Sequence, residues 1–391
     1  MPGIETIEYI IYATCGVVWI LSILRCLSLR QLAREAERAR MTPSPEGELP
    51  PFSVIITSQN QCEELRHNLP LILNQIYPNF EVLVVDINSK DDTKKLLEKM
   101  EEDHSNLRHT FTTSSGRDIS TQRLAITLGI KAATNPWTII TQADCSPISH
   151  LWLRRLGESI KGHRSAEIAI GFTRTKQARS YIEHKMSFYR LWQQMKTFGL
   201  VQKHGAYRCD ATNLAYKKEL FLAHQGFAKH ANLLMGATDI MVNQNSTKHN
   251  TVVCLHPEAT IEQQMPPHKN WVLDRLYFRE SRKYFKHKAF FEIKSIITGI
   301  LPPLRLVTML ATIAIAVWQE QYFIAAIALL LWMVHFGLQG KMFNATMKEL
   351  CNTTQSHLRT ASFMHMLPYW HIRILLQHTF SNKQKYRKKY I

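Results

Sequence analysis

The sequence predicts an α/β domain with a mainly parallel sheet, placed between hydrophobic segments near both ends of the chain. Three short apolar runs have the length and composition of buried strands: Phe52–Thr57, Phe80–Asp86 and Trp137–Thr141. Segments with helical spacing lie between and after them, at Leu65–Gln75, Asp92–Met100 and Ser120–Ala133. This alternation is typical of a parallel sheet covered by helices, and such sheets bind their ligands at the carboxyl ends of the strands.

The N-terminal apolar run, from about Ile7 to Leu24, approaches the roughly 20 residues that a membrane-spanning helix needs. A signal peptide is the competing interpretation, but its first part should be basic, and here Glu5 and Glu8 precede the run. No small-residue cleavage site is evident. We therefore expect an uncleaved anchor, followed by a charged helical stalk over residues 28–40 and the Pro-rich linker Met41–Pro51.

Two further apolar runs, Ile296–Trp318 and Tyr322–Leu338, are each long enough for a tilted membrane span. The polar link between them is short, which favours a helical hairpin. Pro302 and Pro303 interrupt the first run and predict an irregular start. The segment Thr360–Phe380 mixes aromatic, apolar and basic residues, so we expect it to lie along the membrane interface.

The net charge of +17 and the pI near 9.6 indicate an anionic partner. Five arginines follow the first apolar run, and the chain ends in a Lys/Arg-rich segment. This placement favours membrane lipids, and because no zinc-finger or helix-turn-helix signature is present, we expect no nucleic-acid partner. By the positive-inside rule, the arginines predict that the domain faces the cytoplasm. The seven cysteines form no CxxC pair, which argues against a disulfide framework.

Polar clusters follow each predicted strand, at Thr57–Asn60, Asp86–Thr93 and Gln142–Pro147. Small polar side chains in the first cluster could hydrogen-bond a base or ribose, and the Asp86 carboxylate could bind ribose hydroxyls. Asp144 could hold Mg²⁺ or Mn²⁺ against a diphosphate. The alternatives are helix capping for Asp91 and Asp92, and a turn role for Asp144 before Ser-Pro.

Residues Phe52–Leu153 resemble the nucleotide-binding half of glycosyltransferase family 2, whose members have the GT-A fold. Segments that match the family patterns in order are SVIITSQN (53–60), LPLILNQIYP (69–78) with FEVLVVD (80–86), STQRLAITLGIKAA (120–133) and TQADCSP (141–147). The acceptor half is matched by DATNLAY (210–216), Gly226-Phe227 and GATD (236–239). The resemblance covers roughly residues 52–280, and the flanking anchors resemble those of membrane-bound bacterial members.

The resemblance implies an inverting transfer of a sugar from a nucleotide-diphosphate donor to a lipid-linked or glycan acceptor. It implies donor-binding roles for Thr57, Asn60, Asp86, Ser89, Arg123 and Asp144. Asp144 is also the expected ligand for Mg²⁺ or Mn²⁺, and Asp239 is the expected general base that takes the acceptor proton. The alternatives are a helix N-cap for Asp239 and a solvated helix face for Arg123.

Three positions depart from the family pattern. Gln142 replaces the first Asp of the DxD motif, and Ile87 replaces the second Asp of VVDD. The segment Asp274–Phe278 lacks the Arg-Trp of the QxxRW motif of processive synthases. These departures keep open an alternative, a catalytically weak or inactive transferase-like scaffold. A nucleotidyltransferase is disfavoured because Thr57–Asn60 is not a Gly-rich triphosphate loop.

The expected organisation has five parts along the chain. They are an N-terminal transmembrane anchor (1–28), a stalk and linker (29–51), the GT-A domain (52–290), a transmembrane hairpin (291–340) and a basic cytoplasmic or interfacial tail (341–391). The expected location is the bacterial inner membrane, with several spans and a cytoplasmic catalytic domain.

Overall fold

The computed structural model describes residues 2–112, 120–228, 233 and 235–381. The chain forms two compact units. The α/β unit comprises Ala36–Lys286 and Phe380–Ile391, and the helical unit comprises Met1–Glu35 and His287–Thr379. The basic end of the predicted tail, residues 382–391, lies outside the described residues.

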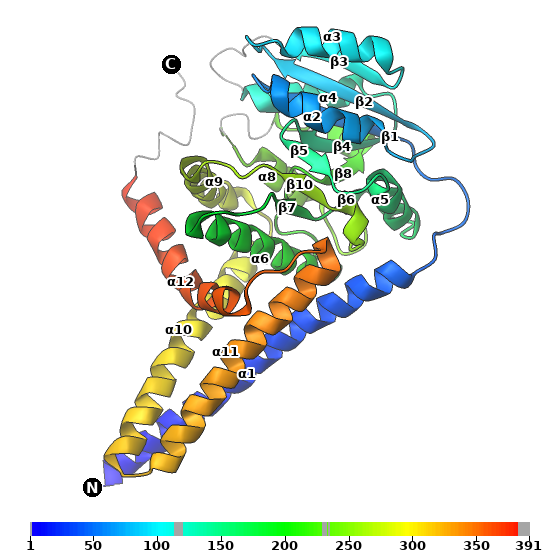
Figure 1. Ribbon diagram of the computed structural model, residues 1–391. Helices are drawn as coiled ribbons and strands as arrows, with labels where there is room; N and C mark the ends of the chain where they lie inside the picture. The colour runs from blue at the N-terminus through cyan, green and yellow to red at the C-terminus, as the bar shows by residue number, and fades with distance from the viewer. Residues whose placement is uncertain (1, 113–119, 229–232, 234, 382–391) are drawn as a thin grey trace. The chain divides into compact units, whose positions relative to one another are not determined.

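The α/β unit alternates strands and helices over most of its length (Figure 1). Its strands are β1 (Phe52–Ser58), β2 (Phe80–Ile87), β3 (Leu107–Thr112), β4 (Trp137–Gln142), β5 (Cys145–Pro147), β6 (Ile168–Ile170), β7 (Thr173–Thr175), β8 (Leu214–Lys217), β9 (Thr251–Val253) and β10 (Ile261–Gln263). Its helices are α2 (Cys62–Leu73), α3 (Thr93–Asp103), α4 (Thr121–Ala132), α5 (Trp152–Lys161), α6 (Tyr181–His204), α7 (Lys218–Ala223), α8 (Ala237–Asn245) and α9 (His268–Ser281), with the 3₁₀ turns η2 (Pro257–Ala259) and η3 (Arg282–Tyr284).

The main sheet has seven strands in the order β3-β2-β1-β4-β8-β6-β9. The pairs β3–β2, β2–β1, β1–β4 and β6–β9 are parallel, whereas β8 is antiparallel to both of its neighbours. A smaller sheet has the order β5-β10-β7. The predicted fold class, a mainly parallel sheet with flanking helices, is therefore confirmed, and all three predicted strands are present as β1, β2 and β4.

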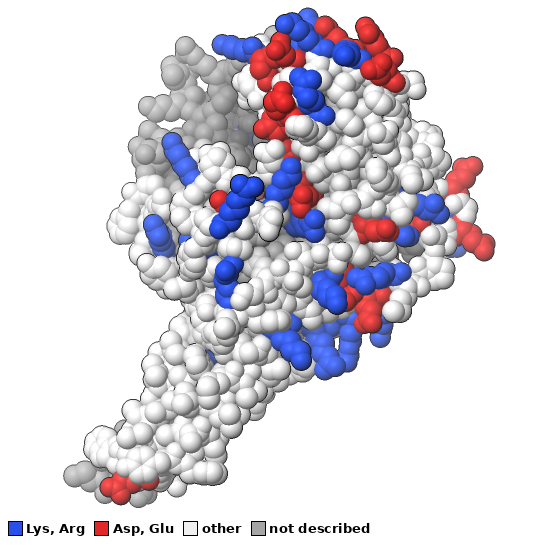
Figure 2. Space-filling view, viewed as in Figure 1, with Lys and Arg blue, Asp and Glu red and all other residues white. Residues whose placement is uncertain are grey.

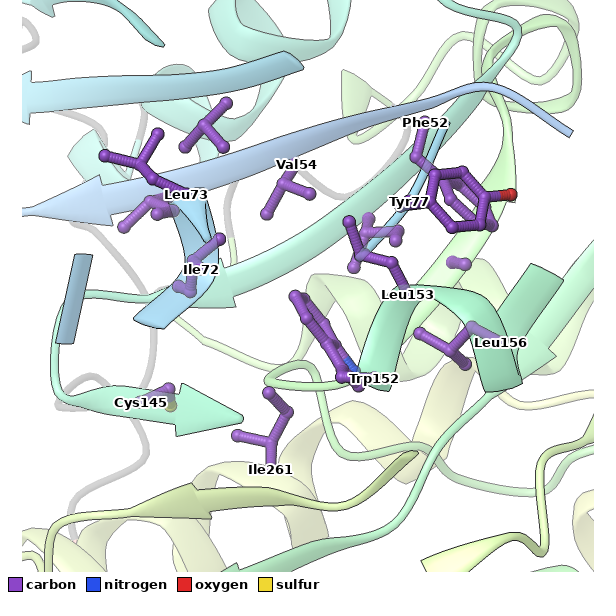
Figure 3. Close-up of a cluster of buried hydrophobic side chains, with 14 of the residues drawn as sticks. Phe52, Val54, Ile72, Leu73, Tyr77, Cys145, Trp152, Leu153, Leu156 and Ile261 are labelled. Atoms are coloured by element: carbon purple, nitrogen blue, oxygen red, sulfur yellow. The ribbon is translucent and has the colours of Figure 1, made fainter. Parts of the chain in front are cut away.

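The hydrophobic core lies against the central strands of the main sheet. Strand β1 is buried along its whole length because helices cover both of its faces. Phe52, Val54 and Ile56 alternate toward α2 and α5, while Ile55 faces α4 on the other side. Figure 3 shows side chains of β1, α2, α5 and β10 meeting in this core around Trp152, which is fully buried.

A buried amide, Asn213, connects three segments of the α/β unit. Its Nδ2 donates to the carbonyl oxygens of Phe172 (2.8 Å) and Ala259 (2.9 Å), and its Oδ1 accepts from the indole N–H of Trp152 (3.1 Å). A Cβ at Gly171 would lie 2.3 Å from the Asn213 amide nitrogen, so only glycine leaves room for this side chain. The close approach fixes the backbone just before β8 and between β6 and β7.

The helical unit contains most of α1 (Pro2–Met41), together with α10 (Lys288–Trp318), α11 (Tyr322–Cys351) and α12 (His357–Phe380). Within the part of the chain that the structure describes, three segments are long and apolar enough to cross a membrane: Glu8–Met41, Gly299–Trp318 and Tyr322–Cys351. On the face shown in Figure 2, the side chains of this unit are mainly uncharged. The predicted spans are thus present as candidate membrane helices.

The helical unit differs from the prediction in two details. The helix α10 continues through Pro302 and Pro303, although a proline inside a helix removes one N–H donor and its ring clashes with the carbonyl four residues earlier. The helix α11 continues beyond the predicted end at Leu338 to Cys351. The boundary predicted at residue 340 therefore falls inside a helix. The last turns of α11 are more polar than its middle, but many of their side chains are buried by packing within the protein.

A buried arginine joins three helices of this unit. Arg305 of α10 is 1% exposed and contacts His335 of α11 and His365 of α12, the latter at 2.8 Å between Nη2 and Nε2. A charged group inside an apolar helical bundle requires polar partners of this kind.

We expect Asn213→Ala to lower the free energy of unfolding by about 2–4 kcal/mol, because it leaves buried groups of Trp152 and Ala259 without their partner. The measurement is the thermal melting temperature of the full-length chain in detergent. The matched control is Asn79→Ala, at an exposed position. Equal melting temperatures for the two variants would contradict the structural role of Asn213.

Candidate functional site

A cleft of about 470 Å³ opens at the carboxyl ends of β1 and β4 in the α/β unit. It is bounded by the start of α4, the middle of α6, the segment before β8, the start of α8, the end of β10 and the start of α9. Four of the predicted site residues line it: Thr57, Arg123, Asp144 and Asp239. A cavity of this size is in the range that holds a nucleotide-sized ligand.

Asp144 lies between β4 and β5 and faces two glutamines. The amide nitrogen Nε2 of Gln263 lies 2.9 and 3.1 Å from the two carboxylate oxygens of Asp144, and 3.1 Å from Oε1 of Gln142. Burial raises the pKa of Asp144, and the amide contacts from Gln263 act in the opposite direction. The position that departs from the DxD pattern, Gln142, thus remains part of the same polar cluster as Asp144.

Asp239 lies in the first turn of α8. The N-cap of that helix is Gly236, with φ of 85°, so the alternative interpretation of Asp239 as the N-cap is wrong. Its Oδ1 accepts from the backbone N–H of Cys209 (3.2 Å), and its Oδ2 lies 3.3 Å from Nε of Arg208. Burial raises the pKa of Asp239 to about 6, although the Arg208 guanidinium opposes this rise.

Arg208 connects Asp239 to a second carboxylate at the cleft. Its Nη2 lies 3.4 Å from Oδ2 of Asp274, and its guanidinium lies 4.1 Å from the ring centroid of Phe278. Asp274 is also 3.7 Å from Nη2 of Arg275. Because Arg208 is held between two carboxylates and a ring, it limits how far the Asp239 carboxylate can turn.

A further ion pair lies on the α6 side of the cleft. Arg190 donates from Nε to Oδ2 of Asp210 (2.7 Å) and contacts the Thr212 hydroxyl (3.3 Å). Burial opposes ionisation of Asp210, but Arg190, the Thr212 hydroxyl and Arg208 together lower the pKa of that carboxyl. Asp210 is therefore an ionised, paired group.

An aromatic wall stands beside these charges. The Arg275 guanidinium lies 4.3 Å from the ring centroid of Tyr189 and 5.2 Å from that of Trp271. The ring of His268 stacks on Trp271 at 5.8 Å. Flat apolar faces next to charged groups are suited to binding a polar ligand that also has hydrophobic faces.

Thr57 and Arg123 occupy the sheet side of the cleft. Thr57 is buried near the end of β1, and its backbone oxygen accepts from the N–H of Ala143 (3.3 Å). Arg123 lies in the first turn of α4 and is 6% exposed, so its predicted alternative as a solvated helix face is wrong. Burial lowers the pKa of Arg123.

The other three predicted donor-binding residues form a separate cluster. Among the described residues, those lining the cleft do not include Asn60, Asp86 or Ser89. The Asp86 carboxylate accepts from the N–H of Ser89 (3.1 Å) and from its hydroxyl, and the Ser89 hydroxyl oxygen accepts from the N–H of Asn60 (2.8 Å). Oδ1 of Asn60 accepts from the N–H of Lys90 (2.8 Å). These contacts tie together the loops that follow β1 and β2.

Two asparagines in this cluster have left-handed backbone conformations, Asn60 with φ of 52° and Asn88 with φ of 48°. Asp91, for which helix capping was an alternative, accepts from the N–H of Cys62 (3.0 Å) at the start of α2 and from the N–H of Thr93 (3.2 Å) at the start of α3. The N-cap of α3 is Asp92, and its side chain makes no cap hydrogen bond, so the alternative of Asp91 as the N-cap is wrong. The Asp91 carboxylate nevertheless accepts from N–H groups at the starts of both helices.

Residues 53–223 match the family model described as glycosyl transferase family 2. This segment is a glycosyltransferase family 2 domain. The chain is also 30% identical over 116 residues to the glycosyltransferase AglE of Haloferax volcanii, a match that covers 29% of this chain and 36% of AglE. The chain therefore spans about a third of the length of this relative.

Solved structures also align with the chain. The mannosyltransferase PcManGT from Pyrobaculum calidifontis, in complex with GDP-Man and Mn²⁺, aligns at 17% identity with a TM-score of 0.49, covering 86% of this chain and 99% of that chain. TarS residues 1–349 of S. aureus, in complex with UDP-GlcNAc, align at 14% identity with a TM-score of 0.42, covering 83% and 92% of the two chains.

The family 2 domain supplies only part of the cleft. Asp144, Arg190 and Arg208 lie inside the matched residues, whereas Asp239 and Gln263 lie beyond them. Sequence reasoning missed four cleft residues: Arg190, Arg208, Asp210 and Gln263. The signal that could have found two of them is the motif DATNLAY, which Asp210 opens and which Arg208 precedes by two residues.

The pKa of Asp239 leads to a pH-dependent stability. The folded value of about 6 exceeds the ordinary value of 3.8, so the folded state holds this proton more tightly than the unfolded chain. Relative to Asp239→Asn, we expect the wild type to lose stability as pH rises through the window from about 4 to about 6, by about 3 kcal/mol at most.

The measurement is the difference in melting temperature between wild type and Asp239→Asn, taken at several pH values in detergent. The control is Asp103→Asn, at an exposed carboxylate of α3. A difference that stays constant across this pH window would show that the Asp239 pKa is unperturbed.

Proposed function

We propose that the protein is an inverting glycosyltransferase. It moves a sugar from a nucleoside-diphosphate donor to a hydroxyl of a membrane-proximal or lipid-linked acceptor. The observation that carries the proposal is that one cleft of about 470 Å³ is lined by both Asp144, near the end of β4, and Asp239, at the start of α8. Asp144 can hold the leaving diphosphate through a divalent cation, and Asp239 can hold the attacking hydroxyl in the same cavity.

The donor end of the cleft has the residues that a diphosphate requires. Arg123 is a buried guanidinium at the start of α4, and guanidinium groups bind phosphate oxygens in bidentate fashion. Its neighbour Thr57 offers a hydroxyl at the end of β1. We assign the base and ribose to the adjoining loops, where Asn60, Asp86 and Ser89 are cross-linked.

The residues around Asp144 fit a divalent cation such as Mg²⁺ or Mn²⁺. Both carboxylate oxygens of Asp144 and Oε1 of Gln142 face one point, since all three lie 2.9–3.1 Å from the same nitrogen of Gln263. Oxygen-only ligands are those that Mg²⁺ and Mn²⁺ prefer. A cation bound there supplies charge neutralisation to the departing diphosphate.

At the acceptor end, Asp239 takes the proton of the attacking hydroxyl. With a pKa of about 6, this carboxyl is mostly ionised at neutral pH, yet it is more basic than an exposed aspartate. Arg208 holds the carboxylate in place at 3.3 Å. Because the base activates the acceptor directly, one displacement at the anomeric carbon suffices, and that displacement inverts its configuration.

We also propose that the protein is a multi-pass membrane protein of the bacterial inner membrane, with the α/β unit in the cytoplasm. The three candidate spans and the arginines that follow the first of them support this arrangement. Nucleotide sugars are made in the cytoplasm, and a lipid-linked acceptor would be presented at the membrane surface.

We expect Asp239→Asn to lower kcat by about 10²–10⁴-fold, because the amide cannot accept the proton, while donor binding is retained. Turnover is measured as nucleoside diphosphate released from a panel of nucleotide sugars, and binding by calorimetry. Asp103→Asn serves as the control at an exposed carboxylate. Donor binding without turnover in the wild type would instead favour the scaffold alternative, which the replacement at Gln142 motivates.

The pH dependence gives an independent test of the base. We expect kcat/KM to rise with pH through about 6 and to level off above it, since only the ionised Asp239 accepts a proton. The measurement is the pH profile of kcat/KM with the same donor. A profile without an acidic limb would assign the base to another group.

A further inference from the structure

The amide of Gln263 makes an unusual set of contacts for a glutamine that no motif includes. One nitrogen, Nε2, lies 2.9 and 3.1 Å from the two oxygens of Asp144 and 3.1 Å from Oε1 of Gln142. An amide nitrogen carries two hydrogens, so one can be shared by the two oxygens of the Asp144 carboxylate while the other is donated to Oε1 of Gln142. Three oxygens from two side chains therefore converge on one point beside Gln263.

The backbone that carries Gln263 is fixed on both sides. In the small sheet Gln263 pairs with Cys145 of β5 and with Thr175 of β7. The Gln263 carbonyl oxygen accepts from the N–H of Lys176 (2.8 Å), and the Asp144 carbonyl oxygen accepts from the N–H of Gln264 (3.1 Å). Only rotation within the side chain can change which end of the amide faces Asp144.

The distances fit a metal octahedron. Two neighbouring ligands of Mg²⁺, each about 2.1 Å from the ion at a right angle, are separated by about 3 Å. The terminal atom of Gln263 has this separation from all three oxygens. A half turn of the amide about its last torsion exchanges the nitrogen and the oxygen at nearly the same point, and this torsion rotates readily.

We propose that Gln263 is a ligand of the divalent cation, together with Asp144 and Gln142. This inference rests on the proposed function, since it concerns the cation of the same donor site. Without a cation, the Gln263 amide donates N–H to the three oxygens. With a cation, the amide turns and presents Oε1, so the same side chain fills both roles.

The charge of this ligand set has a consequence for binding order. One carboxylate and two amides give the site a single negative charge. The positive charge of the Arg190 guanidinium acts on Asp144 and partly offsets that negative charge. A cation alone is therefore held weakly. A nucleoside diphosphate adds the missing negative charge, so cation and donor bind cooperatively.

The test is Mn²⁺ binding to the full-length chain in detergent, followed by electron paramagnetic resonance of free Mn²⁺, with and without GDP or UDP. We expect Gln263→Leu to weaken Mn²⁺ affinity about tenfold or more, since it removes a ligand. We expect Gln263→Glu to tighten binding of Mn²⁺ alone about tenfold or more, since it adds a second carboxylate. Gln264→Leu, the same substitution one residue along the chain, should match the wild type, and Asp144→Asn should abolish binding.

The other outcomes overturn the proposal. Unchanged Mn²⁺ affinity in Gln263→Leu would show that the amide is only structural, and tighter binding would show that it competes with the cation. If Gln263→Leu fails to fold, as judged by its melting temperature, unchanged affinity in Gln263→Glu decides against the ligand role. Absence of Mn²⁺ binding in the wild type, with or without either nucleotide, would also reject it.

Failure of this inference is distinguishable from failure of the proposed function. Binding of GDP, UDP and intact nucleotide sugars is measured in parallel in the presence of EDTA. Nucleotide binding and turnover that persist without a cation would reject the role of Gln263 and leave sugar transfer in place. Loss of all nucleotide binding under every condition would reject both.

Discussion

The geometry of the cleft depends on one buried amide, Asn213. Its three hydrogen bonds reach Trp152 at the start of α5, Phe172 between β6 and β7, and Ala259 in η2. Ala259 lies two residues before β10, the strand that carries Gln263. Asn213 also directly follows Thr212, whose hydroxyl contacts that of Thr173 (3.0 Å), and lies three residues after Asp210. The position of the donor-side polar cluster is thus set from within the core.

Charge pairing is the second constraint on the cleft. Its described lining contains four arginines and four aspartates: Arg123, Arg190, Arg208, Arg275, Asp144, Asp210, Asp239 and Asp274. Buried charges are costly unless they are paired, and Arg208 and Arg190 each hold an aspartate within 3.3 Å. The net charge of +17 therefore comes from outside the cleft lining, where it is available to a membrane surface.

Pattern reasoning located the regular elements well for a physical reason. Strands β1, β2 and β4 are apolar runs buried along most of their length, and such runs are visible in any window of the sequence. The same reasoning found Asp144 and Asp239 through family motifs, and the cleft contains both. Their chemical roles stay predictions.

The residues that escaped prediction share a different property. Gln263 lies on a strand of three residues, too short for any periodicity, and its neighbour in space, Asp144, is more than a hundred residues away. Arg190 lies mid-way along α6, where one arginine looks like any other on a helix. Sequence spacing also did not reveal that Asn60, Asp86 and Ser89 are bonded to each other in loops outside the described cleft lining. Which side chains meet in these clusters depends on contacts between residues far apart in the sequence, and the spacing of residues along the chain does not reveal such contacts.

The left-handed backbone at Asn60 and Asn88 restricts how this loop pair can vary over evolutionary time. Asparagine and glycine tolerate positive φ, whereas β-branched residues are strained there. Glycine at position 60 would keep the backbone conformation but lose the Oδ1 contact to the Lys90 N–H. Asn60 therefore suits its position through its backbone conformation as well as through its side-chain contact. Substitution at this position without backbone strain is therefore confined to the few residue types that tolerate positive φ.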